Sequence, residues 1–293
     1  RKAVQAAGEE ETILISGETG TGKGLLAKAM HGQSSRAAGL FMKVNCGALP
    51  EPLLESELFG HVKGAYTGAA STQDGFFQAA TGGTLFLDEI DNTSFAMQAK
   101  LLQAIEDQEV WKVGARRPDQ VKVRIITAAN TSLEHQIETG NFREDLFYRL
   151  NVISLHMPPL RDRHEDILPL CYFFAEKWAQ AHTKSVPAFS DAVLGYLQSY
   201  SWPGNVRELE HLITELLIYA PKNEITVEML PARIRNPIQK RQVKPFLLEA
   251  IIKDHIHSIC TSTNWNITQA ASLLGLTRQA LYRKLHQFNL GEY

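Results

Sequence analysis

The sequence predicts a parallel α/β domain, followed by a purely helical region and a small all-α module at the C-terminus. Two observations lead to this prediction. Short apolar strands alternate with helical stretches in the first half of the chain, which is typical of a parallel sheet covered on both faces. After Pro158 and Pro159 only helical patterns remain, and the last of them read as helix, glycine turn, helix.

Three strands are expected in the α/β part, at 12–16, 84–87 and 121–129. Each is a short apolar run of the kind that lies inside a parallel sheet. A glycine-rich turn over 17–22 and a helix over 24–31 follow the first strand, and Leu25, Leu26 and Ala29 share one side of that helix. The order strand, turn, helix sets the first unit of the sheet.

The helical region is expected to contain three helices, at 167–182, 191–200 and 206–220, with Asn205 capping the third. Proline and basic residues mark a linker after them. We therefore expect an α/β core over 1–157, a helical lid over 158–232, a linker over 233–244 and a C-terminal domain over 245–293.

Composition is that of an ordinary globular protein, with 44% hydrophobic and 21% charged residues. No apolar run approaches the ~18 residues that span a bilayer, so no membrane association is expected. The three scattered cysteines favour a reducing cytoplasm over a disulfide or metal framework. About a dozen residues precede the first strand, so either the protein lacks an N-terminal sensory domain or this is a fragment.

Charge is unevenly distributed. From Asn236 onward seven Lys or Arg face three Asp or Glu, a net +4, which leaves −6 for the rest of the chain. A basic C-terminal part indicates an anionic partner, although a solvated helix face would give the same count.

The glycine-rich turn matches a phosphate-binding loop through its lysine. Glycines let the backbone wrap around phosphate groups, the next helix directs its positive end at them, and the lysine reaches the β/γ oxygens. Gly24 stands where the general pattern has a Ser or Thr that ligates magnesium. The alternative is a glycine-rich loop without function. The expected nucleotide-binding residues are Gly17, Glu18, Thr19, Gly20, Thr21, Gly22, Lys23 and Gly24.

Two acids end the second strand. Asp88 is expected to hold Mg²⁺, directly or through water, and Glu89 to polarise the attacking water. Paired acids at a strand end are usually just solvated, but together with the phosphate loop they predict an NTPase.

The C-terminal module has a helix, a glycine turn at Gly275 and a second helix that Thr277 caps. Ala270, Ala271 and Leu274 on the first helix, and Leu281 and Leu285 on the second, form an inward face. The outer side of the second helix has the composition of a helix that reads the major groove of DNA. A helical hairpin with a solvated face is the alternative. The candidate DNA contacts are Arg278, Gln279, Tyr282, Arg283 and Lys284.

With these residues placed, the chain resembles the AAA+ domain of the sigma-54-dependent activators (NtrC-type bacterial enhancer-binding proteins), closed by a Fis-type helix-turn-helix. The resemblance is carried most specifically by a loop that the family uses to contact sigma-54. Here its aromatic residue is Tyr instead of Phe, and by itself the loop could be an ordinary surface turn. Its residues are Gly64, Ala65, Tyr66, Thr67, Gly68 and Ala69.

The resemblance also implies roles for single residues. Asn45 would partner Glu89, Asn130 would sense the γ-phosphate, and Arg207 in the lid would contact bound nucleotide. The segment 142–150 matches the one whose arginines enter a neighbouring subunit's site. Arg149 is our first choice for that arginine finger and Arg143 the second. Segment 113–120 corresponds to a second surface loop beside the sigma-54 loop. The family usually has Glu where this chain has Gly24.

The function implied is an ATPase that uses ATP and Mg²⁺, forms a ring-shaped hexamer and remodels the sigma-54 RNA polymerase complex from closed to open. The C-terminal domain would dimerise and bind double-stranded enhancer DNA. Two alternatives stay open: a DNA-binding regulator on the same scaffold that does not act through sigma-54, and an AAA+ remodeller of another protein.

Overall fold

The structure, a computed structural model, describes residues 2–66, 69–220, 224–235, 248–263, 265–288 and 290. The chain divides into two compact units, Arg1–Ile234 and Arg235–Tyr293, and each is described by itself. Thr67 and Gly68 of the predicted sigma-54 loop lie outside the described residues. So do residues 236–247, which comprise most of the predicted linker and the first residues of the predicted C-terminal domain.

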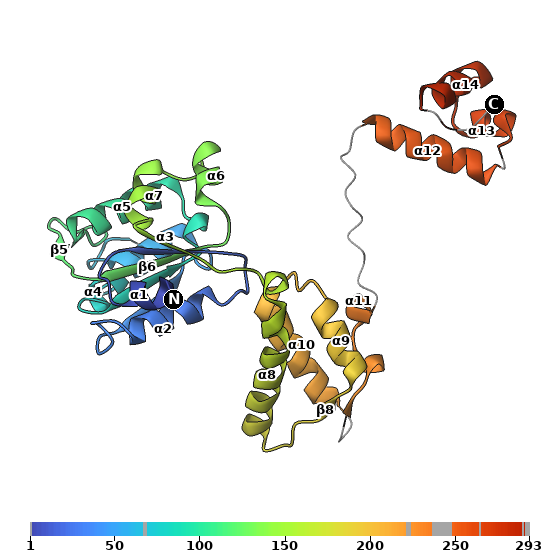
Figure 1. The fold of residues 1–293 in the computed structure, drawn as a ribbon. Helices are drawn as coiled ribbons and strands as arrows, with labels where there is room; N and C mark the ends of the chain where they lie inside the picture. The colour runs from blue at the N-terminus through green and yellow to red at the C-terminus, as the bar shows by residue number, and fades with distance from the viewer. Residues whose placement is uncertain are drawn as a thin grey trace. The chain divides into compact units, whose positions relative to one another are not determined.

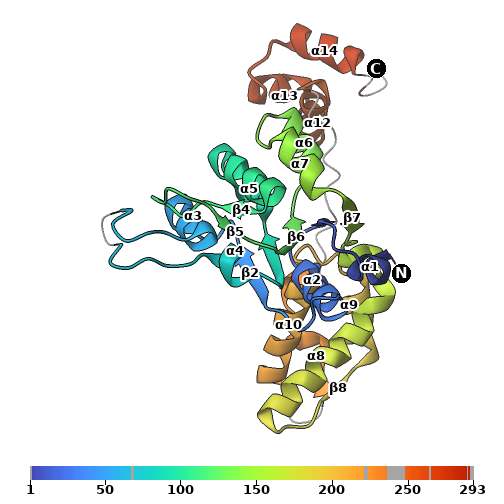
Figure 2. The same cartoon turned by 90° about the vertical axis from the view of Figure 1, so that its left-hand side faces the viewer.

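A five-stranded sheet forms the centre of the first unit (Figures 1 and 2). Every pair of neighbouring strands in it is parallel, so the predicted parallel α/β fold is confirmed. In spatial order the strands are β2 (Phe41–Asn45), β3 (Thr84–Asp88), β6 (Arg124–Ala129), β1 (Ile13–Ser16) and β7 (Ile153–His156).

Helices cover both faces of this sheet, as its nearly continuous apolar strands require. On one face α1 (Lys2–Ala7) and α2 (Lys23–Gly32) pack with Phe86 and Ile126. On the other, Leu85 and Leu87 pack with α3 (Glu51–Phe59), α5 (Phe95–Asp107) and α7 (Glu144–Leu150). The remaining elements of this part are α4 (Phe76–Ala79), α6 (Leu133–Glu138), η1 (Ile90–Asn92), and a small antiparallel pair, β4 (Glu109–Val110) with β5 (Asp119–Gln120).

The third predicted strand is shorter than expected. It begins at Arg124 and not at Val121. The Val121 N–H donates to the carbonyl of Gln108, 2.8 Å away, because this segment continues from the β4–β5 pair before the chain enters the main sheet.

Three helices form the lid: α8 (Ile167–His182), α9 (Asp191–Ser199) and α10 (Asn205–Tyr219). Their apolar faces enclose Trp202, which is fully buried and donates its indole N–H to Leu197. Short elements complete this part: η2 (Leu160–Asp162), η3 (His164–Asp166), β8 (Ala188–Phe189), β9 (Glu224–Ile225), η4 (Val227–Met229) and α11 (Ala232–Arg235). The last occupies the start of the predicted linker.

The prediction that Asn205 caps α10 is wrong. Gly204 is the capping residue, and Asn205 is the first residue of the helix, with φ of 53°. Its side chain is fully buried and bonds to residues outside the helix, which a local sequence pattern does not reveal.

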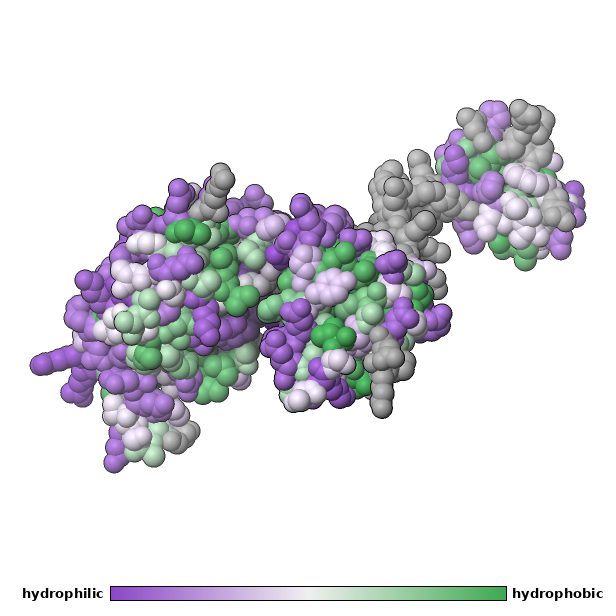
Figure 3. All heavy atoms as spheres, turned by 60° about the horizontal axis from the view of Figure 1, so that its bottom comes forward, coloured by the Kyte–Doolittle hydropathy of each residue, from purple (hydrophilic) through white to green (hydrophobic). Residues whose placement is uncertain are grey.

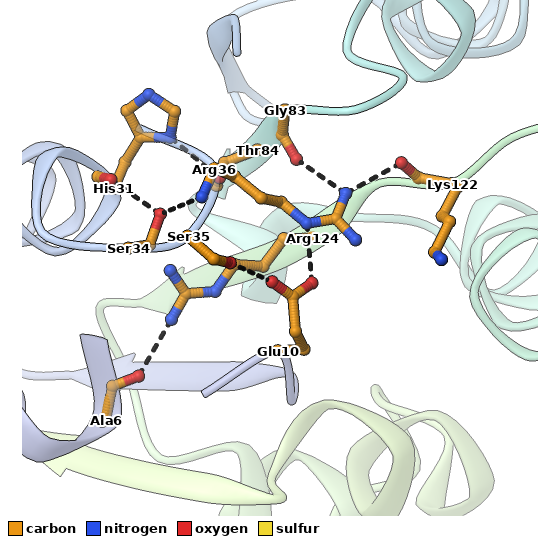
Figure 4. A network of polar contacts seen from close by, with 10 residues as sticks. All are labelled: Ala6, Glu10, His31, Ser34, Ser35, Arg36, Gly83, Thr84, Lys122 and Arg124. Carbon is orange, nitrogen blue, oxygen red and sulfur yellow. Dashed lines mark hydrogen bonds and ion pairs between the residues drawn. The ribbon is translucent and has the colours of Figure 1, made fainter. Parts of the chain in front are cut away.

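The edge of the sheet where its strands begin is tied together by a polar network (Figure 4). Arg36 pairs with Glu10 at 2.6 Å and donates to the carbonyl of Lys122, while Arg124 donates to the carbonyl of Ala6 at 2.9 Å. Arg124 is buried, and its Nε and Nη1 have no hydrogen-bond partner among the described residues. Burial lowers the pKa of Arg124, with the Glu10 carboxylate acting in the opposite direction. These contacts fix α1 and the end of α2 beneath the sheet.

The second unit contains α12 (Leu248–Ser262), α13 (Ile267–Leu273) and α14 (Arg278–Gln287). Thr277 accepts a bond from the N–H of Ala280, so the predicted cap of α14 is confirmed. Ala270, Ala271, Leu281 and Leu285 are buried in a common core, and Leu274 is partly buried and packs against it. The predicted inward face is therefore confirmed.

On the face drawn in Figure 3, hydrophobic residues are interspersed with hydrophilic ones. Among the described residues, no helix has the length and apolar character needed to cross a membrane.

Candidate nucleotide site

The loop between β1 and α2 has the backbone of a phosphate-binding loop. Gly17, Gly20 and Gly22 all have positive φ, at 147°, 81° and 104°, a region that L-residues with side chains rarely enter. A Cβ on Gly20 would lie 2.4 Å from the carbonyl oxygen of Gly204 in the lid. Glycine is therefore needed there both for the turn and for the contact.

Lys23 is buried at the start of α2. Its Nζ donates to the carbonyls of Gly17 at 2.7 Å and Glu18 at 3.0 Å, and to Oδ1 of Asn130 at 2.7 Å. Burial lowers the pKa of Lys23, and the nearby carboxylates of Asp88 and Asp91 oppose that shift. The predicted lysine and the predicted γ-phosphate sensor are thus in direct contact.

Asp88 and Glu89 lie at the carboxyl end of β3, between β2 and β6. The Asp88 carboxylate forms an ion pair with Lys43 at 2.8 Å. Glu89 has φ of 58°, an uncommon conformation for a residue with a side chain, and such outliers cluster at functional sites. It turns the chain immediately after the strand.

Asn45 and Glu89 are both described, and their side chains do not form the predicted contact. Oδ1 of Asn45 accepts from the N–H of Gly47 at 2.8 Å. The Glu89 carboxylate instead accepts from Nδ2 of Asn92 at 3.3 Å. Asn92 follows Glu89 by one helical turn, so a local contact takes the place of the expected one from β2.

Asp91 is a site residue that the sequence analysis missed. Its buried carboxylate accepts bonds from the backbone N–H groups of Asn130 and Thr131 and from the Thr131 hydroxyl, at 3.2, 3.1 and 2.9 Å. These bonds hold Asn130 at the end of β6, where its side chain meets Lys23. The available signal was a third acid in the run Asp-Glu-Ile-Asp.

The lid contacts the loop through Glu18. Arg161 donates two bonds to its carboxylate, at 2.8 and 2.6 Å, and Asn205 donates a third at 3.1 Å. Oδ1 of Asn205 in turn accepts from the N–H of Leu160. The predicted lid residue Arg207 donates its backbone N–H to Gly20 at 3.3 Å. Glu18 is therefore a link between loop and lid.

The two candidate finger arginines have different surroundings. Arg143 pairs with Asp145 at 2.7 Å, which raises the pKa of the guanidinium. Arg149 is exposed near the end of α7 and lines a cavity of about 140 Å³ together with Glu10 and Glu11. Arg143 is thus paired within the chain, whereas Arg149 is exposed.

The donor set suits magnesium bound together with a nucleotide. Among the described residues, no three His, Cys, Asp or Glu side chains converge to hold a metal alone. Mg²⁺ usually keeps several waters and takes one or two carboxylates plus phosphate oxygens, and Asp88 beside the loop supplies such a carboxylate. Burial raises the pKa of Cys46, whose N–H donates to the Asp88 carbonyl, to about 12, which disfavours its thiolate form.

The candidate sigma-54 loop projects after α3. Tyr66 is 47% exposed, and its ring lies 5.2 Å from that of His61, which is buried at the loop base and bonded to Ser56. The N–H of Val62 donates to Val113 at 3.1 Å, so the segment predicted as a second loop runs alongside the first. Gly64, Ala65 and Ala69 belong to the described part of the loop.

The outer side of α14 carries the candidate DNA contacts. Arg278, Gln279, Tyr282 and Arg283 are exposed, and Lys284 lies over the ring of Phe288 at 5.7 Å. Leu281 and Leu285 hold the opposite side of the helix in the core. The predicted DNA-contacting residues therefore lie on the side of α14 opposite its buried face.

A phosphate-binding loop, paired acids after β3 and a helical lid define the first unit as an AAA+ P-loop NTPase domain. Residues 1–156 match the family described as Sigma-54 interaction domain, 161–245 match AAA+ ATPase lid domain, and 253–288 match Bacterial regulatory protein, Fis family. The chain belongs to the sigma-54-dependent transcriptional regulators.

Regulatory protein AtoC of Escherichia coli (strain K12) is 42% identical over 292 residues, which cover 96% of this chain and 63% of AtoC. Crystal structures of NtrX from Brucella abortus are similar over nearly the whole chain. The complex with ADP has a TM-score of 0.75 at 32% identity and covers 98% of this chain and 67% of NtrX. The complex with ATP has a TM-score of 0.73 at 33% identity and covers 99% and 66%. The chain thus spans about two thirds of the length of these relatives.

Proposed function

We propose that this chain hydrolyses ATP to ADP and phosphate and uses the reaction to open the promoter complex of sigma-54 RNA polymerase. The observation that carries the ATPase part is the meeting of Lys23, Asn130 and the Asp88–Glu89 pair at one edge of the sheet. The NtrX complexes with ADP and ATP support nucleotide binding at the same fold.

In this reaction the backbone of residues 17–24 cradles the phosphates and Lys23 neutralises the β/γ oxygens. Asn130, held by Asp91, contacts the γ-phosphate. The Glu89 carboxylate accepts a hydrogen bond from the attacking water and orients this water in line with the leaving group. Asp88 holds magnesium, which when bound neutralises charge on the phosphate oxygens. Arg207 approaches the nucleotide from the lid.

Subunits are proposed to assemble into a hexameric ring with the nucleotide between neighbours. Arg149 then enters the site of the next subunit and stabilises charge on the transferred phosphoryl group. Its exposure on α7 supports this role.

The candidate sigma-54 loop is proposed to contact sigma-54 through Tyr66 and Thr67. We expect Thr67→Ala to leave most ATP hydrolysis intact, because the loop lies outside the nucleotide pocket. Open-complex formation should fall by about 30-fold or more, since central interface contacts often contribute ~2 kcal/mol or more. Phosphate release and promoter opening would be measured on the same preparation.

Val4→Ala, an exposed apolar position on α1 and outside the loop, is the control for promoter opening. A parallel loss of ATPase and opening would assign the loop to the fold or the pocket. Retention of both ATP hydrolysis and promoter opening in Thr67→Ala, or activation in a purified system without sigma-54, would favour a regulator that does not act through sigma-54. Tyr66 in place of Phe is the feature that keeps that alternative open.

The C-terminal unit is proposed to bind enhancer DNA as a dimer, because one helix reads too few base pairs for useful specificity. Arg278→Ala should cost ~1–3 kcal/mol on the cognate site and relax preference at one position. Lys284→Ala should weaken binding to every sequence and reduce the salt dependence by about one charge. Titrations of matched and mismatched palindromes at several salt concentrations distinguish the two. Identical behaviour of both variants would contradict this division of roles.

A further inference from the structure

Lys43 is a second lysine beside the candidate nucleotide site. Its Nζ lies 2.8 Å from Oδ2 of Asp88 and 5.6 Å from the centre of the Phe86 ring. We propose that Lys43 competes with magnesium for Asp88, and that Gly24 provides the space that Lys43 occupies. The inference rests on the proposed ATPase function and adds a residue that sets how much metal the site requires.

The sheet register explains why these groups meet. Lys43 on β2 is paired with Phe86 on β3, and paired residues of neighbouring parallel strands project to the same face. Asp88 follows Phe86 by two residues, so it projects to that face as well. The same face is covered by α2, whose second residue is Gly24. The ammonium group therefore lies beside the Phe86 ring and the first turn of α2.

Gly24 is what makes room for this arrangement. A Cβ at position 24 would lie 3.2 Å from Nζ of Lys43 and 3.5 Å from the Phe86 ring. The first of these contacts is tighter than nine in ten real Cβ contacts, so a side chain at this position would shift the ammonium by a few tenths of an ångström. The departure from both the general loop pattern and the family pattern thus has a local partner in Lys43.

The space beside position 24 is the metal side of the site. In the general phosphate-binding loop, the residue after the lysine supplies a hydroxyl to magnesium. Here that position faces an ammonium group, bonded to the carboxylate proposed as the metal ligand. Lys23 does not have this role, because its bonds go to Gly17, Glu18 and Asn130. The two lysines therefore serve different partners.

Two cations that share one carboxylate oppose each other. Bringing magnesium to Asp88 either breaks the ion pair with Lys43 or leaves two positive charges close together. The pair is partly solvated, with the Lys43 side chain 50% exposed and that of Asp88 16% exposed, so the competition is moderate. Removing the charge should lower the metal concentration at half-saturation by about 1.5-fold to fivefold.

The test uses the full chain saturated with ADP and follows Mn²⁺ binding by the electron paramagnetic resonance of the free ion, with Mg²⁺ as competitor. Lys43→Met keeps the length and apolar stem of the side chain, whereas Lys43→Arg keeps its charge. Lys100→Met is the matched control. Lys100 on α5 forms an ion pair with Glu55 on α3, and its side chain is 49% exposed, nearly the same as that of Lys43.

We expect Lys43→Met to bind Mn²⁺ about 1.5-fold to fivefold more tightly than the wild type, with Lys43→Arg and Lys100→Met close to the wild type. Unchanged binding in Lys43→Met would overturn the proposal, and weaker binding would mean that Lys43 assists the metal. If Lys43→Met does not fold, Lys43→Gln provides a second route. Its uncharged side chain also removes the ion pair with Asp88, so metal binding should tighten in the same direction, and unchanged or weaker binding overturns the proposal. A wild-type protein that neither binds ADP nor hydrolyses ATP would refute the proposed function itself.

Discussion

A Glu89→Gln variant is expected to bind ATP with nearly unchanged affinity and to lose about 100-fold or more of its turnover. The amide keeps the size of the side chain but no longer accepts a proton from the attacking water, and general-base contributions are typically ~10²–10⁴-fold. The contacts of Lys23 and Asp88 with the nucleotide and metal are retained. Fluorescent-nucleotide titration and phosphate release measure the two properties separately.

Glu106→Gln is the control for this variant, since Glu106 is an exposed acid at the end of α5. It should leave both properties unchanged. Unaltered turnover in Glu89→Gln would remove Glu89 from its proposed role, and a loss of ATP binding would assign it to binding instead.

An Arg149→Ala variant is expected to lose about 10³-fold or more of its turnover, because arginine fingers contribute ~10³–10⁵ to phosphoryl transfer. If the arginine acts on the neighbouring subunit, mixing Arg149→Ala with Glu89→Gln restores part of the activity. Some interfaces in the mixed rings then carry an intact arginine from one subunit and an intact glutamate from the other. Phosphate release would be followed across mixing ratios.

Mixed assembly must be demonstrated in the same samples, for example by energy transfer between differently labelled subunits. Arg143→Ala is the informative comparison, because Arg143 pairs with Asp145 in its own subunit and is expected to have the smaller effect. Mixed rings without recovered activity would make Arg149 a structural residue.

The fold was predictable because its signals are local. Apolar runs followed by a glycine-rich turn placed β1, β3 and α2 to within about two residues, a common precision for element ends. The start of β6 was misplaced because Val121 is as apolar as the strand residues, but its N–H bonds to Gln108. Only the β4–β5 pair, a tertiary feature, decides that the strand begins at Arg124.

The candidate site was predictable where a motif is continuous in sequence, as from Gly17 to Gly24 and at Asp88–Glu89. It was not predictable where the contact depends on a distant segment. Asn205 reads locally as a helix cap, but its burial against Glu18 depends on the position of the lid. Lys43 reads as an ordinary strand lysine, and only the register of β2 on β3 brings it to Asp88.

The loop residues that follow Glu18 bond to the lid and also form the proposed phosphate cradle. The carbonyls of Thr19, Gly20 and Thr21 accept bonds from Asn205, Arg207 and Arg163 of the lid, while the same peptide units form the proposed phosphate cradle. Lid position and nucleotide affinity are then thermodynamically linked: a nucleotide that favours one lid position by some factor is itself favoured by that position to the same extent. In the proposed ring, a neighbour pressing on a lid acts as an allosteric effector, so subunits can influence one another's nucleotide state without any contact between their phosphates.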